Sequence, residues 1–450
     1  MDSEHSLTRH QKESILLLQI GTFLEYFDLM LYVHMAVLLN ELFFPPTDPK
    51  TAAILTAFAF CSTYVLRPFG ALIFGYIGDN YGRKPTVIIT TTLMALSCLT
   101  MAVLPTYADI GITAAVMVSV LRIIQGMSSM GEVMGARIYI TEITKPPIQY
   151  QSVCFVSISV AVGSIAALGI ATLTTRTGFN WRIAFMFGVV IALVGIVART
   201  KLRETPEFAN AKTKMKRALE KSAEQGLEKH AELLLGYKLL KGNNAAFDKI
   251  NKKSFFHFFS AFCGWPLSFY LAYIYFIPVL KNSYGYSSAD VILHNFYLSI
   301  FQLLTNIVIL FLSKKIYPLF ISKFIGFLFL GTLLIVPYVM SEYSSIYSIF
   351  FIQALFVSGL RETPSDPIMI KHFPVFRRFS AVTFGYALSR ALMYILISFG
   401  LVYLTDWLGY YGVWLIALPV TFFWLKSIYY YESLEKECGN YPLKGEWQVR

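Results

Sequence analysis

The sequence is poor in charge and lacks the residue patterns that mark catalytic or metal centres. Only 14% of its 450 residues are charged, whereas soluble domains carry about 25%. Its five cysteines include no Cys-x-x-Cys pair, so neither a disulfide framework nor a zinc site is expected. No His-Glu-x-x-His, Walker A, Gly-x-Ser-x-Gly or dinucleotide-binding pattern occurs. We therefore expect no metal, no cofactor and no enzymatic activity.

What the sequence has in excess is apolar surface. Hydrophobic residues make up 56% of the chain, and the mean hydropathy is +0.56. Apolar runs of about twenty residues recur along the whole chain, and each is long enough to cross a hydrocarbon core about 30 Å thick. This pattern predicts an all-α polytopic membrane protein with about twelve transmembrane helices.

The basic residues follow the loops between these runs. Lys and Arg concentrate in alternate loops, for example at Arg83 and Lys84, at Lys314 and Lys315, and at Arg377 and Arg378. The positive-inside rule then places both termini in the cytoplasm. The net charge of +11 does not form a basic stripe beside stacking aromatics, so we expect a lipid bilayer and no nucleic acid as a partner.

One long polar segment, residues 201–253, divides the apolar runs into two groups of about six, as in transporters built from two membrane halves. The predicted organisation is a cytoplasmic N-terminus (1–14), an N-terminal six-helix half (15–199), a cytoplasmic linker (200–254), a C-terminal six-helix half (255–431) and a cytoplasmic tail (432–450).

Two motifs carry chemistry-bearing residues inside the apolar runs. Glu25 and Asp28 are three residues apart and share one face of the first predicted helix. In the fourth, Arg122, Gln125 and Glu132 fall on one face, with glycines opposite. Ionisable groups at membrane depth rarely face lipid and mark substrate or proton routes, so we expect the two polar faces to meet. The alternative is a static ion-pair network that sets helix register.

A third motif is a short loop that lies between the second and third predicted helices. It resembles the loop signature G-x-x-x-D-x-x-G-R-[RK] of the major facilitator superfamily, and the matching residues are Gly75, Asp79, Gly82, Arg83 and Lys84. The resemblance implies a twelve-helix fold in two six-helix halves and a gating role for this loop on the cytoplasmic side. It also implies that Asp79 approaches the eleventh helix, which we expect to begin near Ser380.

Further matches resemble the metabolite:proton symporter branch of that superfamily, which includes proline/betaine transporters. The first-helix pattern is met at Gly21, Glu25 and Asp28, and departs from the branch at Thr22 and Leu29. The fourth-helix pattern R-x-x-Q-G-x-x-x-G-G-E-x-x-G-A is met from Arg122 to Ala136, with Met130 in place of one glycine. The resemblance implies that Glu25, Asp28, Arg122, Gln125 and Glu132 take part in proton coupling or substrate binding.

The second half is less regular. Its equivalent inner loop reads "FLSKKIYP", without the glycine and acid signature. The tenth predicted helix contains "SGLRETPSDP", in which prolines interrupt the helix beside Arg361, Glu362 and Asp366. Such a segment fits a substrate site and equally fits an internal ion pair. Tyr270 and Tyr273, in the seventh helix, are candidate aromatic contacts for a quaternary ammonium.

From these residues and the resemblance we expect a secondary active transporter of a bacterial inner membrane, with protons and a small metabolite as ligands and the proton gradient as its energy source. Proline or glycine betaine is the first expectation for the substrate. The alternatives are a carboxylate such as α-ketoglutarate or citrate, and a transport-inactive membrane sensor with the same fold. The sequence does not determine the oligomeric state.

Overall fold

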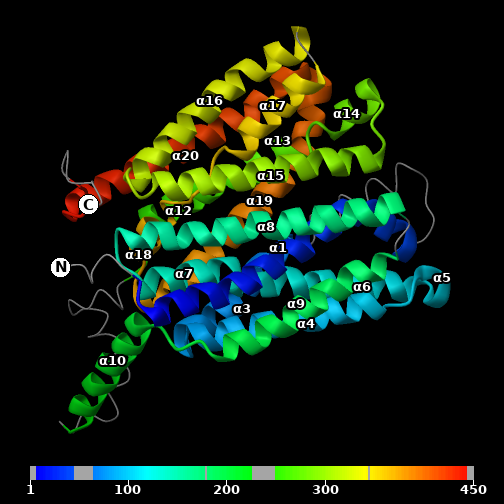
Figure 1. The fold of residues 1–450 in the computed structure, drawn as a ribbon. Coiled ribbons are helices and arrows are strands. Elements are labelled where there is room, and N and C mark those ends of the chain that lie inside the picture. The colour runs from blue at the N-terminus through cyan, green and yellow to red at the C-terminus, as the bar shows by residue number, and fades with distance from the viewer. Residues whose placement is uncertain (1–6, 45–63, 178–179, 225–248, 343–344, 443–450) are drawn as a thin grey trace.

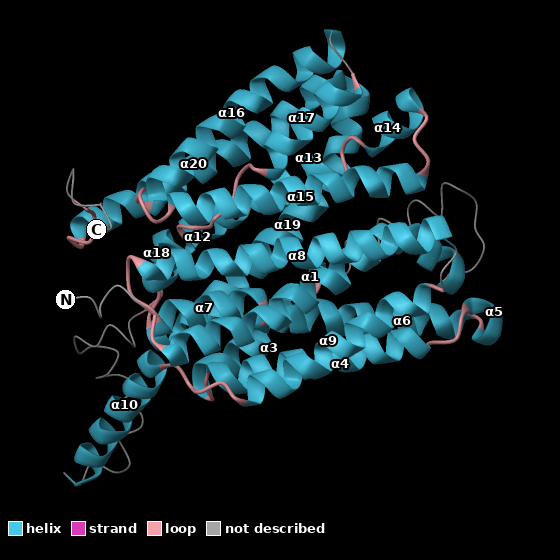
Figure 2. Cartoon of the chain, viewed as in Figure 1, coloured by secondary structure: helices cyan, strands magenta, loops and turns pink. Residues whose placement is uncertain are grey.

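The computed structural model describes residues 7–44, 64–177, 180–224, 249–342 and 345–442, and every element in these ranges is a helix (Figures 1 and 2). The N-terminal helices are α1 (Arg9–Phe43), α3 (Arg67–Asn80), α4 (Arg83–Val103), α5 (Tyr107–Ile110), α6 (Ile112–Ser128), η1 (Ser129–Gly131), α7 (Val133–Ile143), α8 (Ile148–Thr177) and α9 (Trp181–Thr200). After α10 (Pro206–Glu224) come α12 (Lys252–Phe262), α13 (Gly264–Tyr273), α14 (Ile277–Tyr284), α15 (Ser288–Leu312), α16 (Pro318–Glu342), α17 (Ile346–Val357), α18 (Asp366–Lys371), α19 (Val375–Leu408), η2 (Gly409–Gly412) and α20 (Val413–Glu437).

The long helices run roughly side by side in two bundles that meet along two seams. In Figure 1 the bundle from α1 to α9 lies below the bundle that holds α12 to α17 and α20. The α8 helix packs along α15, and α3 packs along α19. Because each seam joins an early helix to a late one, these contacts hold the two bundles together.

The described part of the chain has eight stretches that are long and apolar enough to cross a membrane. One of these, Val375–Glu437, contains both α19 and α20, and two shorter apolar helices add to the set. Many large apolar side chains lie on the outside, including Phe324 (70% exposed) and Val197 (64% exposed). A surface of this kind is stable against lipid and not against water.

Three of the expected transmembrane helices are interrupted. The fourth breaks at η1 into α6 and α7, the seventh breaks at Cys263 into α12 and α13, and the tenth breaks between α17 and α18. In the last break Pro364 and Pro367 have no N–H to donate. Broken helices expose backbone groups that bind polar partners inside a membrane protein.

The helix bounds differ from the expected ones at several points. The first helix begins at Arg9 and not at Ile15, and α20 runs to Glu437, past the expected end of the second half. The helix expected near Ser380 begins five residues earlier, at Val375. Of the predicted linker the structure describes α10, while residues 225–248 lie outside the described ranges, as do Cys61 and the end of the predicted tail.

The start of α1, the helix α10 and the end of α20 all lie at one end of the molecule, on the left in Figure 1. The turn between α3 and α4 lies at this end too, because Glu204, two residues before α10, accepts a hydrogen bond from the backbone N–H of Arg83 at the start of α4. We call it the latch end, after the loop at Gly75–Lys84.

Candidate functional site

Asp28 lies at the centre of a buried polar cluster between α1 and α6. One carboxylate oxygen of Asp28 is 3.1 Å from a terminal nitrogen of Arg122. The other accepts a hydrogen bond of 3.1 Å from the side-chain amide of Gln125 and one of 3.5 Å from the Cys98 thiol. The guanidinium of Arg122 also lies 3.8 Å from the ring centre of Tyr32. The predicted meeting of the two polar faces is confirmed at Asp28, Arg122 and Gln125.

Glu25 is bound differently, through the break in the fourth span. One of its oxygens accepts a hydrogen bond of 3.1 Å from the backbone N–H of Val133. That N–H is free because Val133 is the first residue of α7, and the first N–H groups of a helix have no partner inside the helix. The second oxygen of Glu25 has no hydrogen bond in the described structure and lies 3.9 Å from Arg67.

Arg67 lies at the start of α3 and is only 3% exposed, with its guanidinium 4.5 Å from the ring centre of Tyr64. It therefore supplies the cation that faces Glu25.

Glu132 does not join Asp28. Its carboxylate lies 2.5 Å from Arg199 of α9 and accepts hydrogen bonds of 3.2 and 2.8 Å from Thr90 and Thr91 of α4. Arg199, the last residue of the predicted N-terminal half, is fully buried. A single Arg at the end of an apolar run is typical of a loop boundary, so the sequence held no signal for this pair.

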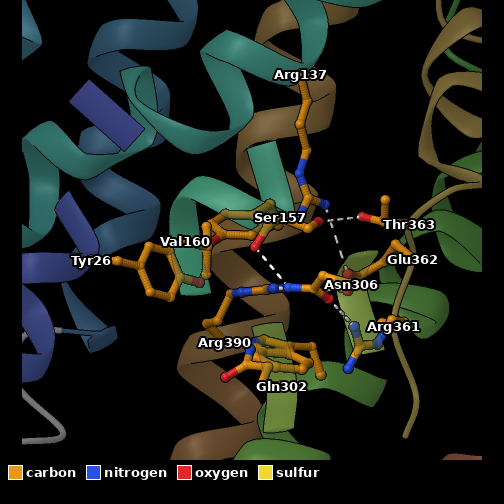
Figure 3. Close-up of a pocket in the computed structure, with 12 residues that line it drawn as sticks. Tyr26, Arg137, Ser157, Val160, Gln302, Asn306, Arg361, Glu362, Thr363 and Arg390 are labelled. Carbon is orange, nitrogen blue, oxygen red and sulfur yellow. Dashed lines mark hydrogen bonds and ion pairs between the residues drawn. The ribbon is translucent and has the colours of Figure 1, made fainter. Parts of the chain in front are cut away.

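A central cavity lies between the two bundles. Figure 3 shows its lining, which comes from α1, α7, α8, α13, α15, the break after α17, and α19. Its volume is about 30 Å³, which is room for about two water molecules. A metabolite therefore fits only when the bundles move apart. The lining residues are Tyr26, Arg137, Ser157, Val160, Trp265, Gln302, Asn306, Arg361, Glu362, Thr363, Tyr386 and Arg390.

Arg361 and Glu362 of the tenth span line this cavity, and the two acids of the span, Glu362 and Asp366, pair with arginines of α7 and α19. Arg137 of α7 lies 2.8 Å from Asp366 and 3.8 Å from Glu362. Arg390 of α19 lies 3.7 Å from the other oxygen of Glu362. The expected internal ion pairs are thus confirmed, and one of their acids, Glu362, lies at the wall of the cavity, while the use of this segment as a substrate site stays a prediction. Arg137 is a member of the site that the sequence did not reveal.

Arg361 is the exception among these charges. It donates hydrogen bonds to the side chain of Asn306 and to the carbonyl oxygen of Val357. Its Nε has no hydrogen-bond partner, and no carboxylate of the described residues lies within ion-pair distance of it. Asn306 in turn donates a 2.8 Å hydrogen bond to the backbone oxygen of Ser157 in α8, so Arg361 is fixed to both bundles.

Neither of the two tyrosines proposed as substrate contacts lines the central cavity, although Tyr273 contacts a residue that does. The Tyr273 hydroxyl is 2.9 Å from Gln302 and 3.2 Å from Ser299. Tyr270 lines a second, larger cavity of about 570 Å³ beside α14 and the end of α19. The aromatic side chains that line the central cavity are instead Tyr26, Trp265 and Tyr386.

At the latch end, Asp79 connects the two bundles. Its oxygens accept hydrogen bonds of 3.0 and 2.9 Å from the backbone N–H groups of Phe379 and Ser380 in α19. This confirms the predicted approach of Asp79 to the eleventh helix. Gly75 permits the contact, because a Cβ atom there would lie 2.9 Å from the Ser380 Cα.

The rest of the loop motif binds two acids. Arg83 is fully buried, 2.9 Å from Glu142 of α7, which also lies 3.1 Å from Arg378 of α19. Gly82 precedes α4 with φ of 129°, a conformation that L side chains rarely adopt. Lys84 contributes its backbone N–H, which lies 3.3 Å from Glu204. Glu142, Arg378 and Glu204 were not predicted as members of this network.

The matching turn of the second half, "FLSKKIYP", is held by other residues. Glu435 of α20 lies 2.7 Å from His372 and 3.5 Å from the Tyr317 hydroxyl, and Lys323 lies 2.8 Å from Glu432. The inner turns of the two halves are therefore held at the latch end by different kinds of contact.

Comparisons with known proteins place the chain in a family. The Major Facilitator Superfamily model matches residues 18–398. A protein of Staphylococcus haemolyticus, provisionally named a proline/betaine transporter, is 37% identical over 207 residues, which is 44% of either chain. The inner membrane metabolite transport protein YhjE of Escherichia coli K12 is 34% identical over 44% of this chain and 47% of its own. The matched region thus spans less than half the length of these relatives.

Solved structures of the proton:xylose symporter XylE share the fold. The complex with 6-bromo-6-deoxy-D-glucose has a TM-score of 0.72 at 15% identity and covers 93% of this chain and 96% of its own. The inward-open form of XylE from E. coli has a TM-score of 0.59 at 16% identity, with 94% and 99% covered. The fold is that of membrane-spanning transporters and not of enzymes. The chain belongs to the Major Facilitator Superfamily.

Proposed function

We propose that this protein is a proton symporter that imports a small compatible solute, with proline or glycine betaine as the first candidates. The observation that carries the proposal is the pair of buried acids on α1, each facing an arginine of a different helix. Asp28 faces Arg122, and Glu25 faces Arg67. Buried carboxylates whose partners are movable cations mark proton routes in membrane proteins.

Proton uptake by Asp28 would break its ion pair with Arg122. A carboxyl group that has gained a proton no longer attracts the guanidinium, and Arg122 is left with Gln125 at 2.7 Å and the Tyr32 ring. Removing one partner of a buried pair costs about 3–5 kcal/mol. A cost of this size is large enough to couple proton binding to a rearrangement of α1 against α6.

Glu25 connects proton binding to the broken fourth helix, because it accepts a hydrogen bond at the break. Its bond to the Val133 N–H joins α1 to the start of α7, and α7 also carries Arg137 at the cavity wall. A change of charge on Glu25 is thereby transmitted to the residues that line the cavity. In this proposal Glu25 and Asp28 are the proton-coupling groups, and the central cavity is the substrate site.

Alternating access then requires the bundles to separate at the latch end. The bonds that must break are those of Asp79 to α19 and of Glu142 to Arg378. In this proposal the latch end faces the cytoplasm of a bacterial cell, with the protein in the inner membrane and both termini inside. Support comes from the basic residues of the α3–α4 turn and α10, and from the bacterial sources of the relatives.

A second candidate is symport of a carboxylate such as α-ketoglutarate or citrate. It is favoured by the three arginines that line the central cavity, Arg137, Arg361 and Arg390. A transport-inactive sensor is the third. Its support is the "FLSKKIYP" turn, which lacks the acid that binds the latch in the first half.

Transport assays distinguish the three. Purified protein in proteoliposomes would receive labelled proline, glycine betaine or α-ketoglutarate, with and without an inward proton gradient. We expect the gradient to drive accumulation of proline or betaine. Gradient-driven uptake of α-ketoglutarate alone would favour the second candidate, and accumulation that ignores the gradient would refute proton symport. No uptake of any of the three would favour the sensor.

A further inference from the structure

The charges around the central cavity balance one by one, with a single cation left over. On the N-terminal side Arg67 pairs with Glu25 and Arg122 pairs with Asp28. At the cavity wall Arg137 pairs with Asp366 and Arg390 pairs with Glu362. Among the described residues of this region, Arg361 alone has no carboxylate at ion-pair distance.

An unbalanced buried cation is costly, because burial removes its hydration and nothing of opposite charge replaces it. Arg361 is 5% exposed and has an Nε–H without an acceptor. A guanidinium binds a carboxylate best through two parallel N–H groups. The unused Nε–H of Arg361 is therefore available to donate a hydrogen bond to a carboxylate.

We infer that Arg361 binds the carboxylate of the transported solute, and that this single free guanidinium selects solutes with one carboxylate over those with two. This rests on the proposed function only in taking the central cavity as the substrate site. One carboxylate satisfies the Arg361 guanidinium. The second carboxylate of a dicarboxylate would have to displace Glu362 or Asp366 from its arginine.

The position of Arg361 also orients the solute. In Figure 3 Arg361 and Tyr26 lie on opposite sides of the cavity. With its carboxylate at Arg361, a solute directs its other end toward Tyr26 of α1, the helix that carries Glu25 and Asp28. The electron-rich ring of a tyrosine suits an ammonium group, so a zwitterion fits the site at both ends.

The test is equilibrium binding to the purified full-length protein in detergent, with no pH gradient. The probes are proline against prolinamide, glycine betaine against choline, and α-ketoglutarate. We expect proline or betaine to bind at least tenfold more tightly than the counterpart that lacks the carboxylate, and more tightly than α-ketoglutarate.

The variant is Arg361→Gln, with Arg217→Gln at an exposed position of α10 as the matched control. We expect Arg361→Gln to weaken binding of the carboxylate probe about 10- to 100-fold, as for loss of a charged hydrogen bond, and the control to bind as the unaltered protein does. Because Arg361 has no acid partner to leave unpaired, Arg361→Gln should fold with an unchanged or higher melting temperature. Arg390→Gln should lower it, because Glu362 then keeps only Arg137, at 3.8 Å, within ion-pair distance.

Four outcomes would overturn the inference: unchanged binding by Arg361→Gln, equal binding of prolinamide or choline, tighter binding of α-ketoglutarate, or no binding of either monocarboxylate. Failure of proton symport would show separately, as uptake that ignores the gradient while this binding pattern persists.

Discussion

Asp79 accepts a hydrogen bond of 2.9 Å from the backbone N–H of Ser380, a residue 301 positions further along the chain. The acid lies at the end of α3 and the N–H lies in the first turns of α19, so one carboxylate joins the two bundles. Charge-assisted bonds of this type are worth about 1.5–3 kcal/mol each. The closed latch end therefore depends on a small number of replaceable contacts.

Asp79→Asn should open the latch end. The amide keeps one acceptor oxygen but loses the charge and the second acceptor, so we expect the open form to gain about 10-fold or more in population. The measurement is labelling of a single cysteine placed at the latch end of a cysteine-free protein. Asp109→Asn, in the exposed α5 turn, is the control. Equal labelling of both variants would contradict the assignment.

Gly75→Ala should have a similar effect through sterics. The added methyl group would lie 2.9 Å from the Ser380 Cα, so α3 and α19 must move apart. Gly331→Ala in α16 is the matched control, since a Cβ there has open space around it, and alanine alone favours a helix by about 0.5–1 kcal/mol. We expect a lower melting temperature for Gly75→Ala and an equal or higher one for Gly331→Ala. A higher melting temperature for both variants would show that α3 and α19 are not in tight contact at Gly75.

Asp28→Asn should uncouple transport from the proton gradient. The amide oxygen can still accept a hydrogen bond from Arg122, which also keeps Gln125 and the Tyr32 ring. We therefore expect a lower melting temperature but continued solute exchange, while gradient-driven accumulation falls at least tenfold. The measurements are counterflow and gradient-driven uptake in the same proteoliposomes, with Glu437→Gln at the exposed end of α20 as control. If gradient-driven uptake is retained, Asp28 is not a coupling group.

Variants at Glu132 distinguish a structural role of this residue from a role in proton coupling. Glu132→Gln leaves the buried Arg199 without its acid and should cost about 3–5 kcal/mol. The double variant Glu132→Gln/Arg199→Gln should recover much of that stability, because no charge then remains unpaired. Thermal unfolding of the single and double variants measures this. A stable Glu132→Gln protein that has lost gradient-driven uptake would instead assign Glu132 to coupling.

The sequence by itself determined the class of structure. Long apolar runs are stable only in lipid and as helices, because every backbone N–H and C=O must be paired there; the eight apolar stretches of the described chain follow from composition alone. Local spacing also sufficed for two parts of the site. Glu25 and Asp28 share a helix face, and the Asp79 loop matches a known signature, so the sequence alone indicates both.

Which charges pair was decided by the tertiary structure. Arg199 and Arg137 looked like ordinary helix or loop-end residues, yet they neutralise Glu132 and Asp366. Their partners come from other helices 67 and 229 positions away, and helical periodicity carries no information on which helices become neighbours. The break at η1 was also decided by the tertiary structure. There Gly131 packs against Thr90, and the backbone N–H of Val133, freed by the break, donates a hydrogen bond to Glu25. Burial makes an arginine without an acid partner costly, and most of these buried arginines face an acid. Arg361 is the one cation of the described cavity wall that does not.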